Sequence, residues 1–491
     1  MLDLLLKNLS VVRPGRDSVE SLDIGITDGR FSRIEASIEP DAAREVRDCG
    51  GLTAFPGIID AHMHVGIYSP LEHDAVTESK AALTGGVTTA ITYFRTGQYY
   101  LNKGGSYRDF YPEVLGISDG KYWVDYAYHL APITSAHIDE MEYLLEQGVP
   151  SFKIFMFYGG YGLHGKSDKD AQRQFLMIGE DDSYDIAHFE FIMRSAARLM
   201  KKYPDLADQI SVSLHCELAD ILNAYTRIVQ NEGKLTGLRA YSAARPPHSE
   251  GLAIWIASYL AYETDCLNIN LLHLTSRKAL EAAVMMESTF PHINFGKEVT
   301  IGHLLLDYDA PTRCHAKVNP PIRSREDVEF LWEKLLEGKV DWVVSDHACC
   351  SEELKVSGQE NTDGNIWVSK SGFGGTEYLL SGLFSEGRRR GLSLPHMARL
   401  ICRNPATRYG LNHKGDIEVG MDADLALLDP DETFVVRAAD SESGQGYTPF
   451  EGCELTGKVE STYLRGELMY RDGKIVGPAR GTYQGRPSKA R

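Results

Sequence analysis

Apolar and polar positions alternate in short runs over the first fifty residues and again near the end of the chain. The early runs, at residues 2–6, 22–26 and 31–34, are separated by turn signals such as Asp28-Gly29. Similar runs recur at residues 423–428, 433–436, 460–465 and 467–470. Each end is too short for a core of its own. The pattern therefore predicts one β domain built from both termini.

The middle of the chain, residues 55–411, follows a different pattern, in which apolar runs typical of buried strands precede amphipathic stretches. We expect eight strands, with ends near Asp60, Tyr93, His129, Phe157, His215, His273, His303 and Ser345. Helical patterns lie between most of them, at residues 139–147, 187–202, 250–263 and 325–337. Eight such βα units predict an α/β fold, a TIM (β/α)8 barrel. The longest departure, residues 159–185, has weak periodicity and is interpreted as a loop or lid.

The amino-acid composition limits the classes of protein to which this chain can belong. The 491 residues are 43% hydrophobic and carry a net charge of −18, which indicates a globular chain and argues against nucleic acid or an anionic membrane as partner. No run of about 18 apolar residues occurs, so no membrane-spanning helix is expected. The N-terminus has no basic leader, and the eight cysteines are scattered without a CxxC motif. We predict reduced thiols and a cytoplasmic location without a signal peptide.

Side chains that can bind metals stand at several of the predicted strand ends. His62 and His64 form an HxH pair, whose side chains fall on the same side of a strand because strand side chains repeat every two residues. Lys153 lies inside an apolar strand, where a lone ammonium is costly unless it is paired, chemically changed or able to reach solvent. His215 and His273 end two further strands, and each alone could be a core histidine. Asp346, after the eighth strand, could bind metal, act as a base or cap a helix.

The combination is more informative than its members. Catalytic groups of such barrels lie at the C-terminal ends of the strands, and five strands here present a ligand-type side chain at that rim. Four histidines, one lysine and one aspartate suffice for two divalent ions, and neutral imidazoles suit Zn²⁺ and its neighbours. An unmodified ammonium cannot bind a cation, so Lys153 needs a further explanation.

Several longer motifs carry a family resemblance. They are Pro56-Gly-Ile-Ile-Asp-Ala-His-Met-His64, Phe152-Lys-Ile-Phe-Met156, Arg245-Pro-Pro247 with Glu250-Gly251, His273-Leu-Thr-Ser276, Asn319-Pro-Pro-Ile-Arg323, Ser345-Asp-His347, Asn404-Pro-Ala406 and the segment from Lys414 to Asp424. In this order and over nearly the whole chain, they resemble the amidohydrolase superfamily. Within it, they are similar to the cyclic amidohydrolases, namely dihydropyrimidinase or hydantoinase, allantoinase and dihydroorotase.

The resemblance implies a domain arrangement and roles for individual residues. It implies a β-sandwich of residues 1–54 plus 412–475, a metal-binding barrel of residues 55–411 and a tail of residues 476–491. His62, His64 and Asp346 would bind the more buried ion, and His215 and His273 the second. Lys153, carboxylated by CO₂, would bridge two ions, with Zn²⁺ expected and Mn²⁺, Co²⁺ or Fe²⁺ as alternatives. A homodimer or homotetramer is also implied.

The same resemblance implies a mechanism. A metal-bound hydroxide would attack the carbonyl of a cyclic amide, imide or ureide, with Asp346 as the base that passes a proton to the leaving nitrogen. Tyr158, five residues after Lys153, would steady the oxyanion, unless it is only a packing aromatic. Asn319 falls where the family contacts the substrate, although it could be a simple turn residue before Pro320. Ser371 stands where a substrate-contacting asparagine is usual.

Departures from the family pattern leave the substrate open. Gly66 stands where dihydroorotases commonly carry an arginine and hydantoinases often an acidic residue. The gap from Lys153 to His215 is 215 − 153 = 62 residues, longer than usual, and residues 159–185 account for the extra length. His303 and His315 could also line the pocket. The alternatives are an amidase of linear amides or carbamates, a single-metal deaminase and a non-catalytic dihydropyrimidinase-like scaffold.

Overall fold

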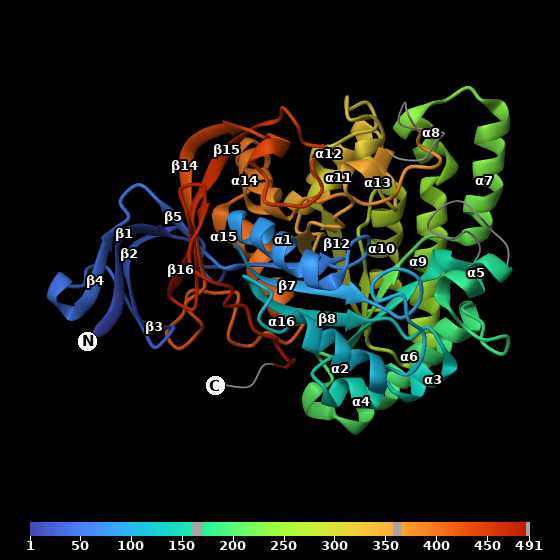
Figure 1. The fold of residues 1–491 in the computed structure, drawn as a ribbon, viewed down its shortest axis with the longest axis horizontal. Helices are drawn as coiled ribbons and strands as arrows, with labels where there is room; N and C mark the ends of the chain where they lie inside the picture. Colours follow the sequence, from blue (N-terminus) through green and yellow to red (C-terminus); the bar gives the residue numbers. More distant parts are fainter. Residues whose placement is uncertain (160–168, 357–364, 488–491) are drawn as a thin grey trace.

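Two sheets organise the computed structural model, which describes residues 1–159, 169–356 and 365–487. Figure 1 shows strands from both ends of the chain on one side of the molecule and the helix-covered barrel on the other. The predicted α/β fold with a barrel and a β domain from both termini is confirmed. Within the described residues, no helix is both long and apolar enough to span a membrane.

Eight parallel strands form the barrel in chain order. They are β6 (Ile58–Met63), β7 (Val87–Phe94), β8 (Asp125–Leu130), β9 (Ser151–Phe155), β10 (Ser211–His215), β11 (Asn268–Leu271), β12 (Asn294–Thr300) and β13 (Trp342–Val344). The first and last strands meet at a bridge between Met63 and His347, and the His64 N–H donates to the His347 oxygen at 2.7 Å. This closure places the HxH segment next to Asp346.

Helices follow the strands and cover the barrel. They are α1 (Leu71–Thr84), α2 (Tyr107–Ser118), α3 (Ser135–Asp139), α4 (Met141–Glu146), α5 (Lys169–Leu176), α6 (Ile186–Lys202), α7 (Ala219–Glu232), α8 (Gly237–Ala244), α9 (Pro247–Thr264), α10 (Arg277–Thr289), α11 (Ile301–Leu305), α12 (Arg325–Leu336), α13 (Glu352–Val356), α14 (Leu379–Arg389), α15 (Leu394–Ala398) and α16 (Asn404–Arg408). Side chains of Asp185, Ser276 and Ser324 cap α6, α10 and α12 by accepting N–H groups that the first turn leaves free.

The second sheet has nine strands, in the order β17-β16-β15-β14-β5-β1-β2-β3, with β4 beside β1. They are β1 (Leu2–Val11), β2 (Glu20–Thr27), β3 (Arg30–Glu35), β4 (Ala43–Asp48), β5 (Thr53–Pro56), β14 (Leu425–Val435), β15 (Glu454–Leu464), β16 (Glu467–Arg471) and β17 (Lys474–Ile475). The two ends of the chain join where β5 pairs with both β1 and β14. Leu6, Ile24 and Leu425 lie in one apolar cluster, so strands of both termini share a core.

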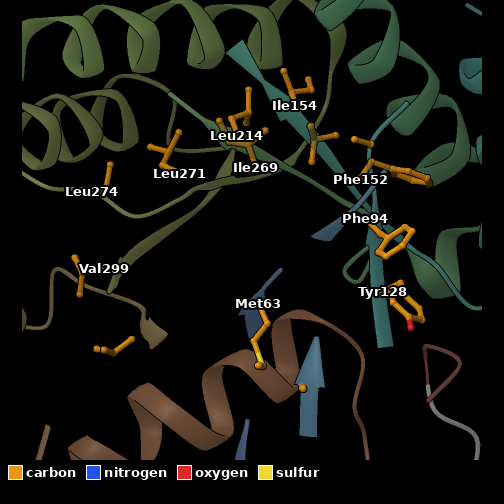
Figure 2. Packing of buried hydrophobic residues seen from close by; sticks show 14 of the residues in the cluster. Met63, Phe94, Tyr128, Phe152, Ile154, Leu214, Ile269, Leu271, Leu274 and Val299 are labelled. Carbon is orange, nitrogen blue, oxygen red and sulfur yellow. The ribbon is translucent and has the colours of Figure 1, made fainter. Parts of the chain in front are cut away.

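The barrel core explains why its strands read as continuous apolar runs. All five residues of β9 and all eight of β7 are buried, because the inner face fills the barrel and the outer face packs against helices. Figure 2 shows Ile154, Leu214 and Ile269 from three neighbouring strands within this cluster.

The structure corrects several expected boundaries. β12 ends at Thr300, and His303 lies on α11. β9 ends at Phe155, and Phe157 belongs to a 3-10 turn, Met156–Gly159. The two strands expected at residues 423–436 form one strand, β14, which is irregular where Pro430 interrupts its pairing. The expected loop at 159–185 contains helix α5, whereas residues 160–168 lie outside the described part of the chain.

The segment after β17 returns to the barrel. Tyr483 forms a bridge with Tyr126 of β8, and the Arg486 N–H donates to the oxygen of Gly148 at 2.9 Å. The Arg486 side chain donates to the Tyr128 oxygen. This part of the chain is therefore packed against the barrel.

Candidate metal centre and active site

One cavity at the C-terminal rim of the barrel collects the residues singled out from the sequence. Its lining includes His64, Lys153, Tyr158, His215, His273, Asn319, Asp346 and Ser371. His62 is fully buried, and its ring centroid lies 5.4 Å from that of His273. The parallel strands all end at this rim, which is why residues up to 371 − 62 = 309 positions apart meet here. The structure thus brings all nine predicted site residues together.

Asp346 lies between the two histidines of the HxH pair. Its Oδ1 atom is 3.2 Å from Nε2 of His62 and 3.2 Å from Nε2 of His64. Donor atoms of His62, His273 and Asp346 all lie within 4.8 Å of one another. Three such side chains around one point can hold a divalent cation.

The remaining donors lie on β9 and β10 and just after β11. The rings of His215 and His273 are 4.3 Å apart between centroids and nearly perpendicular. Lys153 is 1% exposed, and its Nζ lies 4.3 Å from the centre of the Tyr93 ring. No hydrogen-bond partner of this Nζ occurs among the described residues. The lysine therefore does not reach solvent, which the sequence had left open.

Two of the donors have a backbone conformation that side-chain-bearing residues seldom adopt. The φ angle is +37° at His273 and +54° at Asp346. Each lies two residues past the end of a barrel strand, His273 after β11 and Asp346 after β13. Such left-handed conformations cost energy and cluster at functional sites, where the surrounding structure holds a side chain in place.

Burial sets the protonation states in the cavity. It lowers the pKa of His215 to about 4 and holds the pKa values of His62 and His273 well below the ordinary value, so the rings are neutral at pH 7. Burial also lowers the pKa of the Lys153 amine to about 7. Burial raises the pKa of the Asp346 carboxyl, but its interactions with the adjacent His62 and His64 rings outweigh burial and hold that pKa at about 2. The site thus combines neutral nitrogen donors with an ionised carboxylate.

Unpartnered buried atoms indicate that the residues present fit a divalent ion. Nε2 of His62, Nδ1 of His273 and Nζ of Lys153 are buried without a hydrogen bond to any described residue. Buried polar atoms are normally paired, and an unpaired one costs about 1–3 kcal/mol. A cation beside the two imidazole nitrogens removes that cost, and a carboxylated Lys153 would supply anionic oxygens in the same cavity.

Sequence reasoning missed the residues that orient these histidines. Nδ1 of His62 hydrogen-bonds to Oε1 of Glu298 at 2.7 Å, Nε2 of His215 to Oε2 of Glu217 at 2.7 Å, and Nδ1 of His64 to the phenol of Tyr100 at 3.0 Å. Each bond leaves the other ring nitrogen free for a metal, which is the usual arrangement of metal-binding histidines. Glu298 could have been noticed as a carboxylate within one of the expected barrel strands.

The proposed substrate contacts lie on the same cavity wall. Asn319 Oδ1 accepts a hydrogen bond from Tyr241 at 2.5 Å, and its Nδ2 has no partner among the described residues. The Ser371 oxygen accepts from Tyr68 at 2.6 Å, and its hydroxyl lies 3.4 Å from the Tyr241 phenol. Tyr241, which the sequence did not single out, therefore lies against two of the three predicted contacts, Asn319 and Ser371.

Tyr158 lines the cavity beside helix α5. Its ring stacks on Phe155 at 4.6 Å, and Gln172 of α5 donates to its backbone oxygen at 2.6 Å. Burial raises the pKa of the Tyr158 phenol, while the charge of Arg95, 5.4 Å from the ring, lowers it. The phenol therefore keeps its proton at neutral pH and can donate a hydrogen bond into the cavity.

Two other histidines do not line this cavity. His303 is satisfied by the Thr300 hydroxyl at 2.7 Å and the Pro320 oxygen at 3.1 Å. His315 stacks on Tyr447 at 4.4 Å. The structure therefore places neither residue in the wall of this cavity.

Comparisons with known proteins identify the family of this chain. The model of the Amidohydrolase family matches residues 379–470. An allantoinase of Salmonella choleraesuis is 30% identical over 95% of this chain and 95% of its own. A D-hydantoinase structure is 25% identical with a TM-score of 0.84 over 100% of both chains. An L-hydantoinase (dihydropyrimidinase) structure from Arthrobacter aurescens is 25% identical with a TM-score of 0.81, over 97% of this chain and 98% of its own. By its sequence and its fold, the chain belongs to the amidohydrolase superfamily and, within it, to the cyclic amidohydrolase family.

Proposed function

We propose that this protein opens a cyclic amide, imide or ureide by hydrolysing a ring C–N bond. The observation that carries the proposal is the meeting of six ligand-type side chains at one cavity, with three buried nitrogen atoms left unpartnered. The allantoinase and hydantoinase relatives favour cyclic ureides among these substrates. The protein is thus expected to act on the ring and not on a peptide.

His62, His64 and Asp346 would hold one divalent ion, and His215 and His273 a second. Lys153, as a carbamate, would be their shared ligand. A pKa of about 7 leaves much of its amine unprotonated at neutral pH, and that form can add to CO₂ with loss of one proton. When bound, the ions polarise the scissile carbonyl and lower the pKa of water. Zn²⁺ is expected, and Mn²⁺, Co²⁺ and Fe²⁺ are alternatives.

The chain's own residues would handle the proton and the charge. The ionised Asp346 takes a proton from the attacking water and delivers it to the leaving ring nitrogen. The Tyr158 phenol donates a hydrogen bond to the oxygen that becomes negative as the carbonyl is attacked. Asn319 offers its free Nδ2–H group to a substrate carbonyl, and Ser371 lies within reach on the same wall. We also propose self-assembly as a homodimer or homotetramer, and location in the cytoplasm stays a prediction.

The test measures metal content and ring opening for the wild type and two variants. Allantoin, hydantoin, dihydrouracil, a cyclic imide and a lactam serve as substrates, beside linear amides. We expect two ions per wild-type chain and ring opening of at least one ureide. Lys153→Ala should lose metal and activity, whereas Asp346→Asn should lower kcat by about 10²–10⁴-fold. Lys297→Met is the matched control, because Lys297 is also buried but pairs with Glu287 at 2.6 Å away from the cavity. Unchanged metal content in Lys153→Ala would refute the bridging role.

A further inference from the structure

Helix α9 exposes an apolar stripe that nothing in the described structure covers. Leu252, Trp255, Tyr259 and Tyr262 are 49%, 48%, 55% and 45% exposed. Their spacing of three, four and three residues puts them on one face of the helix. The opposite face, with Ala253, Ile254, Ala257 and Ala261, is fully buried in the barrel core. We call the four exposed residues the α9 patch.

The composition of α9 is unusual for a helix on a protein surface. No charged residue occurs between Gly251 and Tyr262, and every exposed residue in that stretch belongs to the α9 patch. By contrast, α6 exposes charged side chains such as Glu190 and Arg194, which pair with each other at 2.6 Å. A helix that is apolar on all sides is normally covered on all sides. The exposed face of α9 is therefore expected to be buried by a partner.

Neighbouring residues extend the patch. Tyr262 stacks on Phe290 with 4.9 Å between ring centroids, and the adjacent helix α10 exposes Met285 at 51%. At its edge, Lys201 pairs with Asp265 at 3.0 Å, and both side chains are about two-thirds exposed. An apolar centre rich in Tyr and Trp with a charged rim is the composition of a protein–protein interface.

The chemistry of the patch indicates what covers it. Each copy carries a net charge of −18, so a close contact between two copies needs a surface without charges, and the α9 patch is one. An isologous contact places the same patch on both sides, and an apolar stripe along one helix is complementary to itself. A membrane surface is a poorer fit, because α9 offers no Lys or Arg to anionic lipids.

The exposed apolar area of the patch is large enough to form the centre of a contact between two copies. A fully covered Tyr or Trp buries about 150–250 Å², so the three half-exposed rings, Leu252 and Met285 offer roughly 500 Å² per copy. A stable interface buries about 800 Å² per partner. The patch supplies more than half of this, and its charged rim can supply the rest.

We propose that two copies of this chain associate through their α9 patches. This inference rests on the self-assembly proposed above and specifies its surface, with Trp255 and Tyr259 near the centre of the stripe. The two helices would cross with their aromatic rings interleaved, excluding water from all four residues of each copy. The α9 patch is also independent of the ring-opening chemistry, since none of its residues lines the cavity.

The experiment measures the molar mass of the full-length, metal-loaded protein by sedimentation velocity over a range of concentrations. We expect the wild type to associate, and Trp255→Glu and Tyr259→Glu each to raise the dissociation constant by about 100-fold or more. Val419→Glu is the control, because Val419 is an equally apolar residue that is 65% exposed in the β domain. Far-UV circular dichroism and metal content verify folding. If Trp255→Glu does not fold, Tyr259→Ser tests the most exposed patch position instead.

Each outcome decides a separate question. If association is lost in Trp255→Glu and in Tyr259→Glu but kept in Val419→Glu, the result supports the α9 patch as the contact surface. Unchanged association in all variants overturns the patch and leaves self-assembly standing. A wild type that is monomeric at every concentration overturns both, and co-sedimentation of that monomer with lipid vesicles would assign α9 to a membrane surface. None of these readouts depends on catalytic activity, so failure of the proposed reaction is seen separately.

Discussion

Oε1 of Glu298 accepts a hydrogen bond from Nδ1 of His62 at 2.7 Å, although the two residues lie 236 positions apart. The same oxygen accepts the backbone N–H of His273 at 3.1 Å, and Oε2 accepts the Trp342 indole N–H at 2.9 Å. One carboxylate thus fixes the ring orientation of one proposed ligand and the backbone of another. Its partners come from strands β6 and β13 and from the turn after β11.

Glu298→Gln should therefore weaken metal binding. A glutamine amide has only one acceptor oxygen, so either His62 or Trp342 would face an NH₂ group. Loss of such a supporting carboxylate typically costs 10–100-fold in metal affinity, and chelator competition measures this. Glu287→Gln is the control, since Glu287 pairs with Lys297 on the outside of the barrel. Equal metal affinity in both variants would show that Glu298 does not orient His62.

Tyr158→Phe should lower kcat about 10²-fold with little change in KM, because its phenol is proposed to bind charge that develops only in the transition state. Steady-state kinetics on a ureide substrate separates the two constants. The control Tyr107→Phe removes another buried phenol, which donates to the Ala131 oxygen at 2.6 Å away from the cavity. If KM rose in Tyr158→Phe while kcat stayed constant, the phenol would instead bind the ground state.

Lys414→Met should destabilise the fold by about 3 kcal/mol or more, because it removes the buried cation that two buried carboxylates share. Nζ of Lys414 lies 2.8 Å from Asp125 of β8 and 2.5 Å from Asp424, next to β14, and so joins the barrel to the β domain. Urea unfolding measures the change. Lys458→Met, which breaks an exposed pair with Glu432, should cost less than about 1 kcal/mol. Similar costs for both variants would contradict a buried ionic link.

Asp23 should make stability depend on pH. Burial raises the pKa of this carboxyl, but hydrogen bonds from Lys7 and from the N–H groups of Asn8 and Ile38 outweigh it and lower the pKa below its ordinary value. A carboxylate whose pKa is lowered by folding stabilises the folded state at pH values above its pKa in the unfolded chain, about 3.9. This stabilisation is lost as the pH falls through the lower pKa of the folded state. The stability gap between wild type and Asp23→Asn should be about 2 kcal/mol at pH 7 and shrink below about pH 4. Urea titrations at both pH values measure it, and a gap that widens in acid would refute the assignment.

The proposed ligands could be predicted from the sequence because parallel barrel strands end at one rim. His62 and His64 share a face through the two-residue period of a strand, and His215 ends its own strand, so their convergence follows from topology. The residues at which the strands end were harder to predict than the strands themselves. His303 follows an apolar run as His215 does, but it lies in a short helix that the Thr300 hydroxyl caps by accepting the His303 backbone N–H. This is a local hydrogen bond that periodicity does not record.

The sequence by itself determined which side chains stand at the strand ends, and through them the family, because strand period and barrel topology are local and regular properties. Only the tertiary structure decided which groups hold those side chains in place, such as Glu298 for His62 and Tyr241 for Asn319. It also showed that the outer face of α9 is apolar and uncovered. These relationships depend on the closure and packing of the barrel, which bring together residues whose separation along the chain carries no regular signal.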